Sequence, residues 1–425
     1  MSATKWPSKA LGELFVVGAG KTMSAAARTG ENKIPFLRTS NVLWDEIDLS
    51  EVDEMAMSER ELAEKLVEPG DLLVCEGGEI GRAAIWEFGA APMSFQNHIH
   101  RLRPQADDVD PRFYVYFLQS AFTQLGIFEG VGNKTTIPNL SSGRLKALAV
   151  PHPPLPEQVA IADALRYLQG ARRMNQRMLV TTQELKSAAM QQLFTRGLWG
   201  AEPKQTEIGP IPSEWALKTI NDHFSVVSGG TPARGNPEYW SGGTIPWVKT
   251  TEVNYSVITE TEEHITKLGL DGSAAKVLPP GTLLMAMYGQ GVTRGRVGIL
   301  GIEASCNQAS AAITPTDDAV VPRYLYHYLT SRYKAIRSLA HGGQQQNLNL
   351  DIVRKICLPV PPTPDEQREI VEVLDALDRK IDLHRRKREV LDRLFKSLMH
   401  KLMTREVSVD DLDLSAIPTV DRSAA

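Results

Sequence analysis

The hydrophobic residues change their spacing along the chain. Residues 1–154 and 201–363 carry short apolar segments separated by glycine and proline, such as 71–75 and 282–286, a pattern typical of strands in an α+β domain. Between Glu366 and Arg405 neither proline nor glycine occurs, and apolar residues recur at alternating intervals of four and three, with interruptions at His384 and Arg388. This heptad spacing predicts a long helix with a narrow apolar seam.

A weaker form of the same seam occurs earlier, from Ile161 to Leu193, where Arg172, Asn175, Thr182 and Lys186 replace apolar residues. Two separate amphipathic helices, each packed on its own domain, would also fit this pattern. Equal length and shared heptad spacing favour helices that pack together. The residues expected to be buried in the seam are Leu165, Leu168, Leu179, Leu374, Leu377, Leu391 and Leu398.

The sequence also repeats itself at a nearly constant offset. Trp6 to Leu11 matches Trp215 to Ile220, and other blocks repeat in the same order: 34–42 with 245–253, 69–73 with 280–284, and 111–118 with 322–329. A proline-rich hinge, 151–158, corresponds to 359–367. So many matched blocks indicate a tandem duplication.

The connectivity predicts how the helices pair. The first must lead from the first domain to the second and the second must lead back, so paired helices run antiparallel and the chain ends meet. We therefore predict an α+β fold in tandem duplication, with two globular α/β domains joined by two long antiparallel coiled-coil helices that form a rod. The expected boundaries are 1–154 for the first domain, 155–200 for the first helix, 201–363 for the second domain, 364–405 for the second helix, and 406–425 for an acidic, flexible tail.

Composition narrows the class of protein. Hydrophobic residues make up 42% and charged residues 23% of the chain, as in globular proteins. No apolar run approaches the ~20 residues of a membrane span, so we expect a cytoplasmic protein. The net charge of −4 means that any nucleic-acid partner must bind local patches. Cys75, Cys306 and Cys357 lack the spacing of a disulfide framework or a cysteine zinc site.

Several segments imitate catalytic motifs without completing them. Val17 to Thr22 lacks the first glycine of a phosphate-binding loop, and Asn236 to Tyr239 lacks the second proline of an amino-methyltransferase turn. Asp365 and Asp378 imitate a nuclease signature but lie on the predicted heptad helix, and His98 and His100 lack a third metal ligand. We therefore predict no catalytic residue and no metal site.

Three polar loops recur in both copies with different side chains. Hydroxyl, amide and guanidinium groups on glycine-rich turns can contact base edges and phosphates, although ordinary polar loops also carry them. The candidate DNA-binding residues are Arg38, Thr39, Ser40, Arg82, Lys134 and Thr135 in the first copy, and Lys249, Thr250, Tyr288, Arg294, Arg296, Gln344, Gln345 and Gln346 in the second.

The hinges, the tandem copies, the long helices ending in Leu-x-Thr-Arg and the block Ser305-Cys306-Asn307-Gln308 together resemble the specificity subunit of type I restriction-modification enzymes. The resemblance covers the chain up to Arg405. It departs in the first copy, where Ser94-Phe95-Gln96-Asn97 replaces the second copy's block.

The resemblance implies that each domain is a target recognition domain that reads one half of a split, asymmetric site in double-stranded DNA. The helices would set the spacer and dock two methyltransferase subunits, joined by two restriction subunits where these exist. The chain would be non-catalytic in a prokaryotic cytoplasm and bind no cofactor. S-adenosylmethionine would belong to the methyltransferase, and ATP and Mg to a motor-nuclease. The alternatives are a self-contained DNA methyltransferase or nuclease, and a cytoplasmic scaffold that does not bind DNA.

Overall fold

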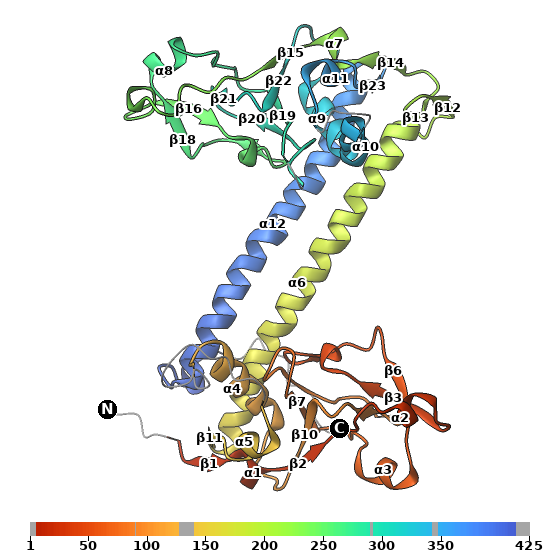
Figure 1. Cartoon of the computed structure of the whole chain (residues 1–425), viewed down its shortest axis with the longest axis vertical. Coiled ribbons are helices and arrows are strands. Elements are labelled where there is room, and N and C mark those ends of the chain that lie inside the picture. The colour runs from red at the N-terminus through yellow and green to blue at the C-terminus, as the bar shows by residue number, and fades with distance from the viewer. Residues whose placement is uncertain (1–5, 90, 127–139, 290–291, 342–346, 414–425) are drawn as a thin grey trace. The chain divides into compact units, whose positions relative to one another are not determined.

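The computed structural model describes residues 6–89, 91–126, 140–289, 292–341 and 347–413. Contacts divide the chain into two compact units: unit 1 contains Met1–Gln176 with Arg386–Ala425, and unit 2 contains Arg177–Arg385. The two long helices, α6 (Leu155–Arg196) and α12 (Pro364–Met403), each contribute to both units (Figure 1). Each unit therefore contains one globular domain, the start of that domain's own helix and the end of the other helix.

Unit 1 is built on an antiparallel sheet in the order β2-β10-β7-β8. These strands are β2 (Phe15–Ala19), β10 (Ile99–Pro104), β7 (Leu72–Cys75) and β8 (Ala83–Ile85). Leu102 on the central strand pairs with Val17 on one side and Leu72 on the other. Helix α4 (Pro111–Thr123) is capped by Asp110, whose carboxylate accepts a hydrogen bond from the Arg112 amide. This helix packs against the β7 and β8 side of the sheet.

The smaller elements of unit 1 surround this sheet. A second sheet has the order β6-β3-β9, with β6 (Asp53–Ala56), β3 (Lys33–Leu37) and β9 (Ser94–Phe95). Two strand pairs join β1 (Ser8–Ala10) to β11 (Ala149–Pro151) and β4 (Val42–Leu43) to β5 (Glu46–Ile47). The short helices are α1 (Leu11–Leu14), α2 (Ala25–Thr29), η1 (Thr39–Asn41), α3 (Glu59–Glu64) and α5 (Ser142–Lys146).

Unit 2 repeats this topology. Its main sheet has the order β15-β22-β19-β20-β17, with β15 (Phe224–Ser228), β22 (Ser310–Pro315), β19 (Leu283–Ala286), β20 (Val297–Leu300) and β17 (Val257–Ile258). Its second sheet has the order β18-β16-β21, with β18 (Glu263–Ile265), β16 (Ile245–Val248) and β21 (Ser305–Cys306). Strand β14 (Ala216–Thr219) pairs with β23 (Cys357–Val360), as β1 pairs with β11.

The helices of unit 2 include α9 (Pro322–Ser331), which corresponds to α4 in the repeated sequence, and the shorter α7 (Ile220–His223), η2 (Pro237–Tyr239), η3 (Thr250–Glu252), α8 (Lys267–Asp271), α10 (Tyr333–Ser338), η4 (Leu339–His341) and α11 (Leu350–Arg354). A hairpin of β12 (Pro203–Thr206) and β13 (Gly209–Pro212) precedes the repeat. Helix η5 (Val409–Asp411) follows α12 in unit 1. The matching strand orders confirm the predicted α+β tandem duplication.

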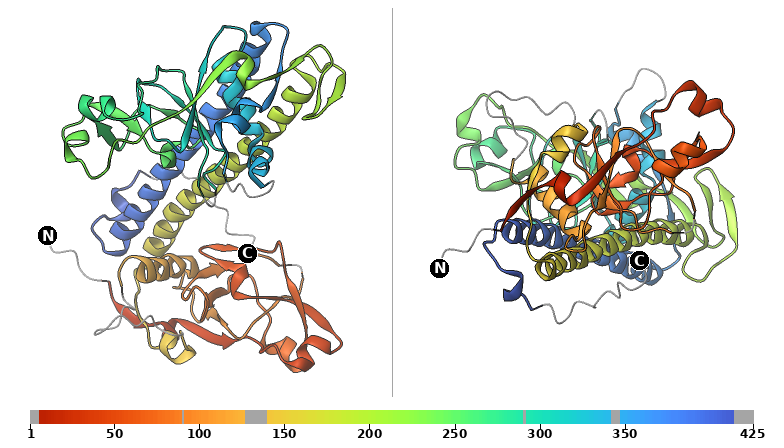
Figure 2. Two further views of the ribbon diagram at one scale, coloured as in Figure 1. Left: turned by 45° about the horizontal axis from the view of Figure 1, so that its top comes forward. Right: turned by 90° about the horizontal axis from the view of Figure 1, so that it is seen from below.

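The long helices pair antiparallel within each unit. In unit 1 the Nε of Arg172 on α6 lies 2.7 Å from a carboxylate oxygen of Asp392 on α12, and in unit 2 the Nζ of Lys186 lies 2.5 Å from Asp378. The start of one helix thus lies beside the end of the other, as both views in Figure 2 show. These pairs explain why Arg172 and Lys186 occupy seam positions of the first helix.

The seam leucines differ in burial. Leu165, Leu179 and Leu374 are buried, whereas Leu168, Leu377, Leu391 and Leu398 are half-buried. In unit 1, Leu165 shares a core with Phe395 and Leu402 from α12. In unit 2, Leu374 shares the equivalent core with Leu193 and Phe194 from α6. The two helices are therefore part of the core of both units.

The hinge motif fastens each helix to its domain. In unit 1 the Trp6 indole donates a hydrogen bond of 3.1 Å to Glu157, and in unit 2 the Trp215 indole donates one of 3.2 Å to Glu366. The next residue, Gln158 or Gln367, is fully buried. The side-chain Oε1 of Gln158 accepts a hydrogen bond from the Asp110 amide at 2.9 Å, so the motif connects α6 to the loop that precedes α4.

Residues near the two chain ends meet in unit 1, as the connectivity predicts. The Arg405 guanidinium lies over the Trp6 ring, 5.0 Å from its centroid. Its Nη2 is also 4.0 Å from a carboxylate oxygen of Glu157. Among the described helices, none combines the length and apolar character that a bilayer crossing requires.

Candidate nucleic-acid interface

The first candidate loop of unit 1 follows β3 and is shaped by Asn41. This buried side chain accepts a hydrogen bond from the Arg38 amide at 2.8 Å and donates to the carbonyls of Asp48 and Glu51, both at 2.8 Å. Arg38 forms an ion pair of 2.9 Å with Asp53. Thr39 is half-buried and Ser40 is exposed, so Ser40 is the most accessible of the three candidates.

The second loop, 76–82, lies against the first. The Cys75 thiol is 3.8 Å from the Thr39 carbonyl. Gly81 has φ +84°, and a side chain there would overlap the Phe122 ring, so the loop requires this glycine. Arg82 pairs with Glu79. Lys134 and Thr135 lie outside the described residues, but their segment ends at Leu140, whose amide donates to the Glu76 carbonyl at 3.1 Å.

The loops of unit 2 start from the same framework. Lys249 precedes η3 and forms ion pairs with Glu262 and, at 3.7 Å, with Glu263. These acidic partners raise the pKa of Lys249, and the hydrogen bond to Glu262 has the largest effect. The Thr250 hydroxyl is hydrogen-bonded to the side-chain amide of Asn307 at 2.8–2.9 Å. The next residue, Thr251, is exposed.

The second loop of unit 2 combines basic and aromatic side chains. Tyr288 is 43% exposed, whereas Arg294 is 9% exposed and presents little of its charge to solvent. Arg296 donates to the Asn254 side chain at 2.8 Å and lies over the Tyr255 ring.

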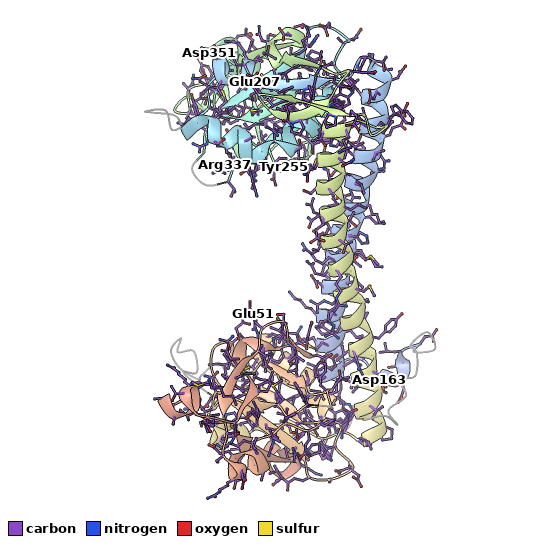
Figure 3. The ribbon with its side chains drawn as sticks, turned by 90° about the vertical axis from the view of Figure 1, so that its right-hand side faces the viewer. Glu51, Asp163, Glu207, Tyr255, Arg337 and Asp351 are labelled. Carbon is purple, nitrogen blue, oxygen red and sulfur yellow. The ribbon has the colours of Figure 1, made fainter. Side chains whose placement is uncertain are left out.

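An aromatic and basic edge next to this loop was missed by the sequence analysis. The hydroxyl of Tyr333 donates to the Val292 carbonyl, and Arg337 lies over the Tyr333 ring. The Tyr255 and Tyr333 rings meet edge to face, 5.9 Å apart, and Figure 3 shows Tyr255 and Arg337 side by side. An Arg and Tyr pair four residues apart on a helix could have signalled this edge.

The residues that follow the third loop make an equivalent contact in the two units. Gln344, Gln345 and Gln346 lie outside the described residues. The segment that follows them leads to Leu348, whose amide donates to the Met287 carbonyl at 3.1 Å. Met287 corresponds to Glu76 in the repeat, so the first part of the chain described after each third segment makes the same main-chain contact in both units.

Charged clamps hold each domain on the helices. In unit 2, Asp375 of α12 accepts from Arg323 at 2.8 Å and from His327 at 2.7 Å, and Asp378 pairs with Lys186. His327, Asp375 and Asp378 are close enough to hold a metal ion. However, Arg323 and Lys186 already neutralise the charges of the two carboxylates. Burial lowers the pKa of His327, so this cluster suits a structural contact without net charge.

The clamp of unit 1 uses different residues at matching positions. The Tyr116 hydroxyl, in the place of His327, donates to the buried Asp45 at 2.6 Å. Glu87 accepts from Arg112 at 2.7 Å and from Arg166 of α6 at 3.0 Å. Arg166 corresponds to Asp375 in the repeat, so the helix carries a positive charge at this position in unit 1 and a negative charge in unit 2. In unit 1, Glu87 supplies the carboxylate that neutralises Arg166.

The segments that imitate catalytic motifs have structural roles. A side chain at Gly20 would overlap the carbonyl oxygens of Phe95 and Gln96. Close packing of the main chain therefore explains why glycine occupies this position, and phosphate binding is not needed to explain it. The Lys21 ammonium lies 2.6 Å from Glu61, and this hydrogen bond lowers the pKa of Glu61 to about 2. Asn236 caps η2 by accepting from the Glu238 amide at 3.1 Å.

The histidine and cysteine side chains fit structural roles as well. The buried His100 ring contacts the Leu140 carbonyl at 2.8 Å. Cys75 and Cys306 are buried and Cys357 is half-buried. Burial raises the pKa of the Cys75 and Cys306 thiols to about 12, which keeps them protonated and unreactive at neutral pH.

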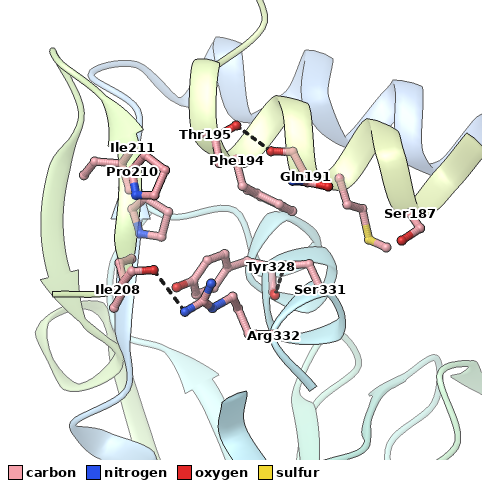
Figure 4. Close-up of a pocket in the computed structure, with 12 residues that line it drawn as sticks. Ser187, Gln191, Phe194, Thr195, Ile208, Pro210, Ile211, Tyr328, Ser331 and Arg332 are labelled. Atoms are coloured by element: carbon pink, nitrogen blue, oxygen red, sulfur yellow. Dashed lines mark hydrogen bonds between the residues drawn. The ribbon is translucent and has the colours of Figure 1, made fainter. Parts of the chain in front are cut away.

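A pocket of about 440 Å³ lies in unit 2 between α6, the β12-β13 hairpin and α9 (Figure 4). Phe194, Ile211 and Tyr328 form part of its wall. The guanidinium of Arg332, which also lines the pocket, donates a hydrogen bond to the Ile208 carbonyl at 3.0 Å and so holds the hairpin in place. Among the described residues that line it, none is a carboxylate, histidine or cysteine.

Comparisons with known proteins agree with this architecture. The model of the family described as "type I restriction modification DNA specificity domain" matches residues 4–178 and 212–393. The MjaIX specificity subunit of Methanocaldococcus jannaschii is 29% identical over 204 residues, 46% of this chain and 45% of that relative. The putative MjaX specificity subunit of the same organism is 23% identical over 90% of both chains.

A solved structure shows the same fold. The crystal structure of a type I restriction-modification S subunit from M. genitalium aligns with a TM-score of 0.62 at 16% identity, over 95% of this chain and 97% of that one. The family model matches well over half of the chain, in two segments that correspond to the two copies. The chain therefore belongs to the type I restriction-modification DNA specificity family.

Proposed function

We propose that this chain is the DNA-reading subunit of a type I restriction-modification complex, in which each globular domain reads one half of a split DNA site. The observation that carries this proposal is a main-chain contact at the base of the loops that recurs in both units. The contact of Leu140 with Glu76 in one unit recurs as that of Leu348 with Met287 in the other. The side chains on the loops differ, so two similar frameworks present two different surfaces, and the two halves of the site differ in sequence.

The chemistry of the loops supports DNA as the ligand. Exposed hydroxyl groups of Ser40 and Thr251 can hydrogen-bond to base edges, and exposed Tyr288 can contact sugar or base. Some basic residues of the loops pair with a single acidic residue, as Arg38 does with Asp53. Such exposed ion pairs are worth little and can be exchanged for phosphate contacts.

The helices offer surfaces for the methylating partner. Apolar side chains remain exposed at equivalent positions of the two copies, Met174 and Leu383 in one pair and Leu185 and Leu394 in the other, each 48–63% exposed. Exposed apolar residues that recur on both helices favour protein partners. We infer that two methyltransferase subunits dock here, one on each unit, with restriction subunits joining where they exist.

The chain itself contributes recognition and no chemistry in this proposal. S-adenosylmethionine binds the methyltransferase, and ATP with Mg binds a motor-nuclease partner. The complex acts where DNA lies, in a prokaryotic cytoplasm.

The proposal is tested with the purified chain, alone and with a type I methyltransferase subunit. Together they should methylate DNA at a two-part motif and shift that DNA in a gel, with affinity that falls steeply as salt increases. The chain alone should transfer no methyl group. Methyl transfer by the isolated chain, or a complex that methylates without sequence preference, would contradict the proposal.

A further inference from the structure

Asn307 lies at the base of the first loop of unit 2. It follows β21, which pairs in parallel with β16, and its amide donates to the Val248 carbonyl at 3.1 Å. Val248 is the last residue of β16, so the loop that starts at Lys249 leaves the sheet beside Asn307.

The Asn307 side chain holds Thr250 by both ends of its amide. Its Oδ1 lies 2.9 Å and its Nδ2 lies 2.8 Å from the Thr250 hydroxyl. The hydroxyl can donate its proton to Oδ1 and accept one from Nδ2. The Ser310 hydroxyl also donates to Oδ1 at 3.0 Å, which fixes the amide in place. Thr250 is therefore engaged by protein, while the exposed Thr251 is not held in this way.

The neighbouring residue extends this anchor to a second segment. Gln308 accepts a hydrogen bond from the Thr231 hydroxyl, and the Trp247 indole donates to the Gly230 carbonyl at 2.9 Å. The block 305–308 thus ties together the loop after β16 and the segment after β15.

We propose that Asn307 is a positioning residue for DNA recognition by the second domain: it fixes Thr250 so that Thr251 presents its side chain to the DNA. This inference rests on the proposed function and deepens it. Thr250 is then an anchor of the loop, although the sequence suggested it as a DNA contact.

The first domain positions its loop differently. Gln96 corresponds to Asn307, and its amide donates to the Leu37 carbonyl at 2.9 Å, as Asn307 does to Val248. Within the described part of unit 1, no hydrogen bond joins the side chains of Gln96 and Thr39. Removing the Asn307 side chain should therefore affect one half of the site only.

The test maps methylated sites genome-wide for the full chain with its methyltransferase partner. Asn307→Ala should relax discrimination in the second domain's half-site by roughly five- to tenfold, the effect of about one lost hydrogen bond, and leave the other half unchanged. Thr250→Val should do the same, Thr250→Ser should retain the parent motif, and Thr251→Val should change the preferred base. The double variant Asn307→Ala with Thr250→Val should be no worse than either single variant.

Thr330→Val is the matched control, because it removes a hydroxyl hydrogen bond of 2.8 Å to the Tyr326 carbonyl in the same domain. It should retain the parent motif. Four results would each overturn this inference without affecting the proposed function. The two-part motif could be unchanged by Asn307→Ala, or the effects of the Asn307 and Thr250 variants could be additive. Thr251→Val could leave the preferred base unchanged, or Thr330→Val could relax the half-site as much as Asn307→Ala does. A parent complex without a two-part motif would overturn the proposed function and this inference with it.

Discussion

The buried hinge glutamine of unit 2 provides a direct test of how each domain is fastened to its helix. The Gln367 side chain is fully buried, accepts a hydrogen bond from the Val321 amide at 2.8 Å and donates to the Ala319 carbonyl at 2.8 Å. Gln367→Ala leaves both backbone groups without this partner. At ~1–3 kcal/mol for each unsatisfied buried group, the free energy of unfolding should fall by about 2–6 kcal/mol.

Urea unfolding of the full chain measures this loss. With a slope of about 3 kcal/mol/M, the midpoint should fall by roughly 1 M. Gln367→Glu keeps the shape and the acceptor but loses the donor, so it should also destabilise the chain. Glu372→Ala is the control, since Glu372 is exposed on the same helix, and its change should stay within about 0.5 kcal/mol. A Gln367→Ala protein that unfolds like the Glu372→Ala protein would refute the view that the hinge is a hydrogen-bonded fastener.

Three further predictions concern packing, charge and spacing. Leu374→Ala in the buried seam should cost about 2–5 kcal/mol in the same unfolding experiment, whereas Leu383→Ala, 63% exposed, should cost little; equal losses would contradict the seam. The pKa of Glu61 is lowered from 4.5 to about 2, mainly by the hydrogen bond from Lys21 and further by hydrogen bonds from Ser58, so these contacts should stabilise unit 1 fully above pH 4.5 and progressively less as the pH falls towards 2. In Lys21→Met, an NMR titration should show the pKa of Glu61 moving back towards 4.5; no movement would contradict the pairing. Inserting one heptad into both α6 and α12 lengthens each by ~10 Å and should widen the unread DNA gap by about three base pairs, with both half-sites unchanged in a methylation map; an unchanged gap would show that the helices do not set it.

Repeated blocks made the architecture readable from the sequence. The offset between Trp6 and Trp215 and the heptad spacing after Glu366 predicted the duplication and the paired helices, because both depend on local patterns. The polar seam residues could not be interpreted in this way. Lys186 is balanced by Asp378, 192 residues away in the chain, and only the fold brings the two together.

The candidate interface was predicted more coarsely than the fold. Sequence located the loops, because glycine and polar residues mark turns, but it could not separate residues that anchor a loop from residues that face outward. Arg294 is buried, Thr250 is held by Asn307, and Thr251 is exposed, yet all three have side chains suited to DNA contact. Their surroundings depend on distant segments such as the block 305–308, which sequence spacing alone does not place.

A domain exchange tests directly whether each domain reads its own half of the DNA site. Residues 201–363 would be replaced by the equivalent domain of another type I specificity subunit, and methylated sites would be mapped genome-wide with the same methyltransferase partner. One half-site should change to that of the donor domain, while the other half-site and the unread DNA between them stay as they were. A change in both half-sites, or in neither, would contradict this division of the site.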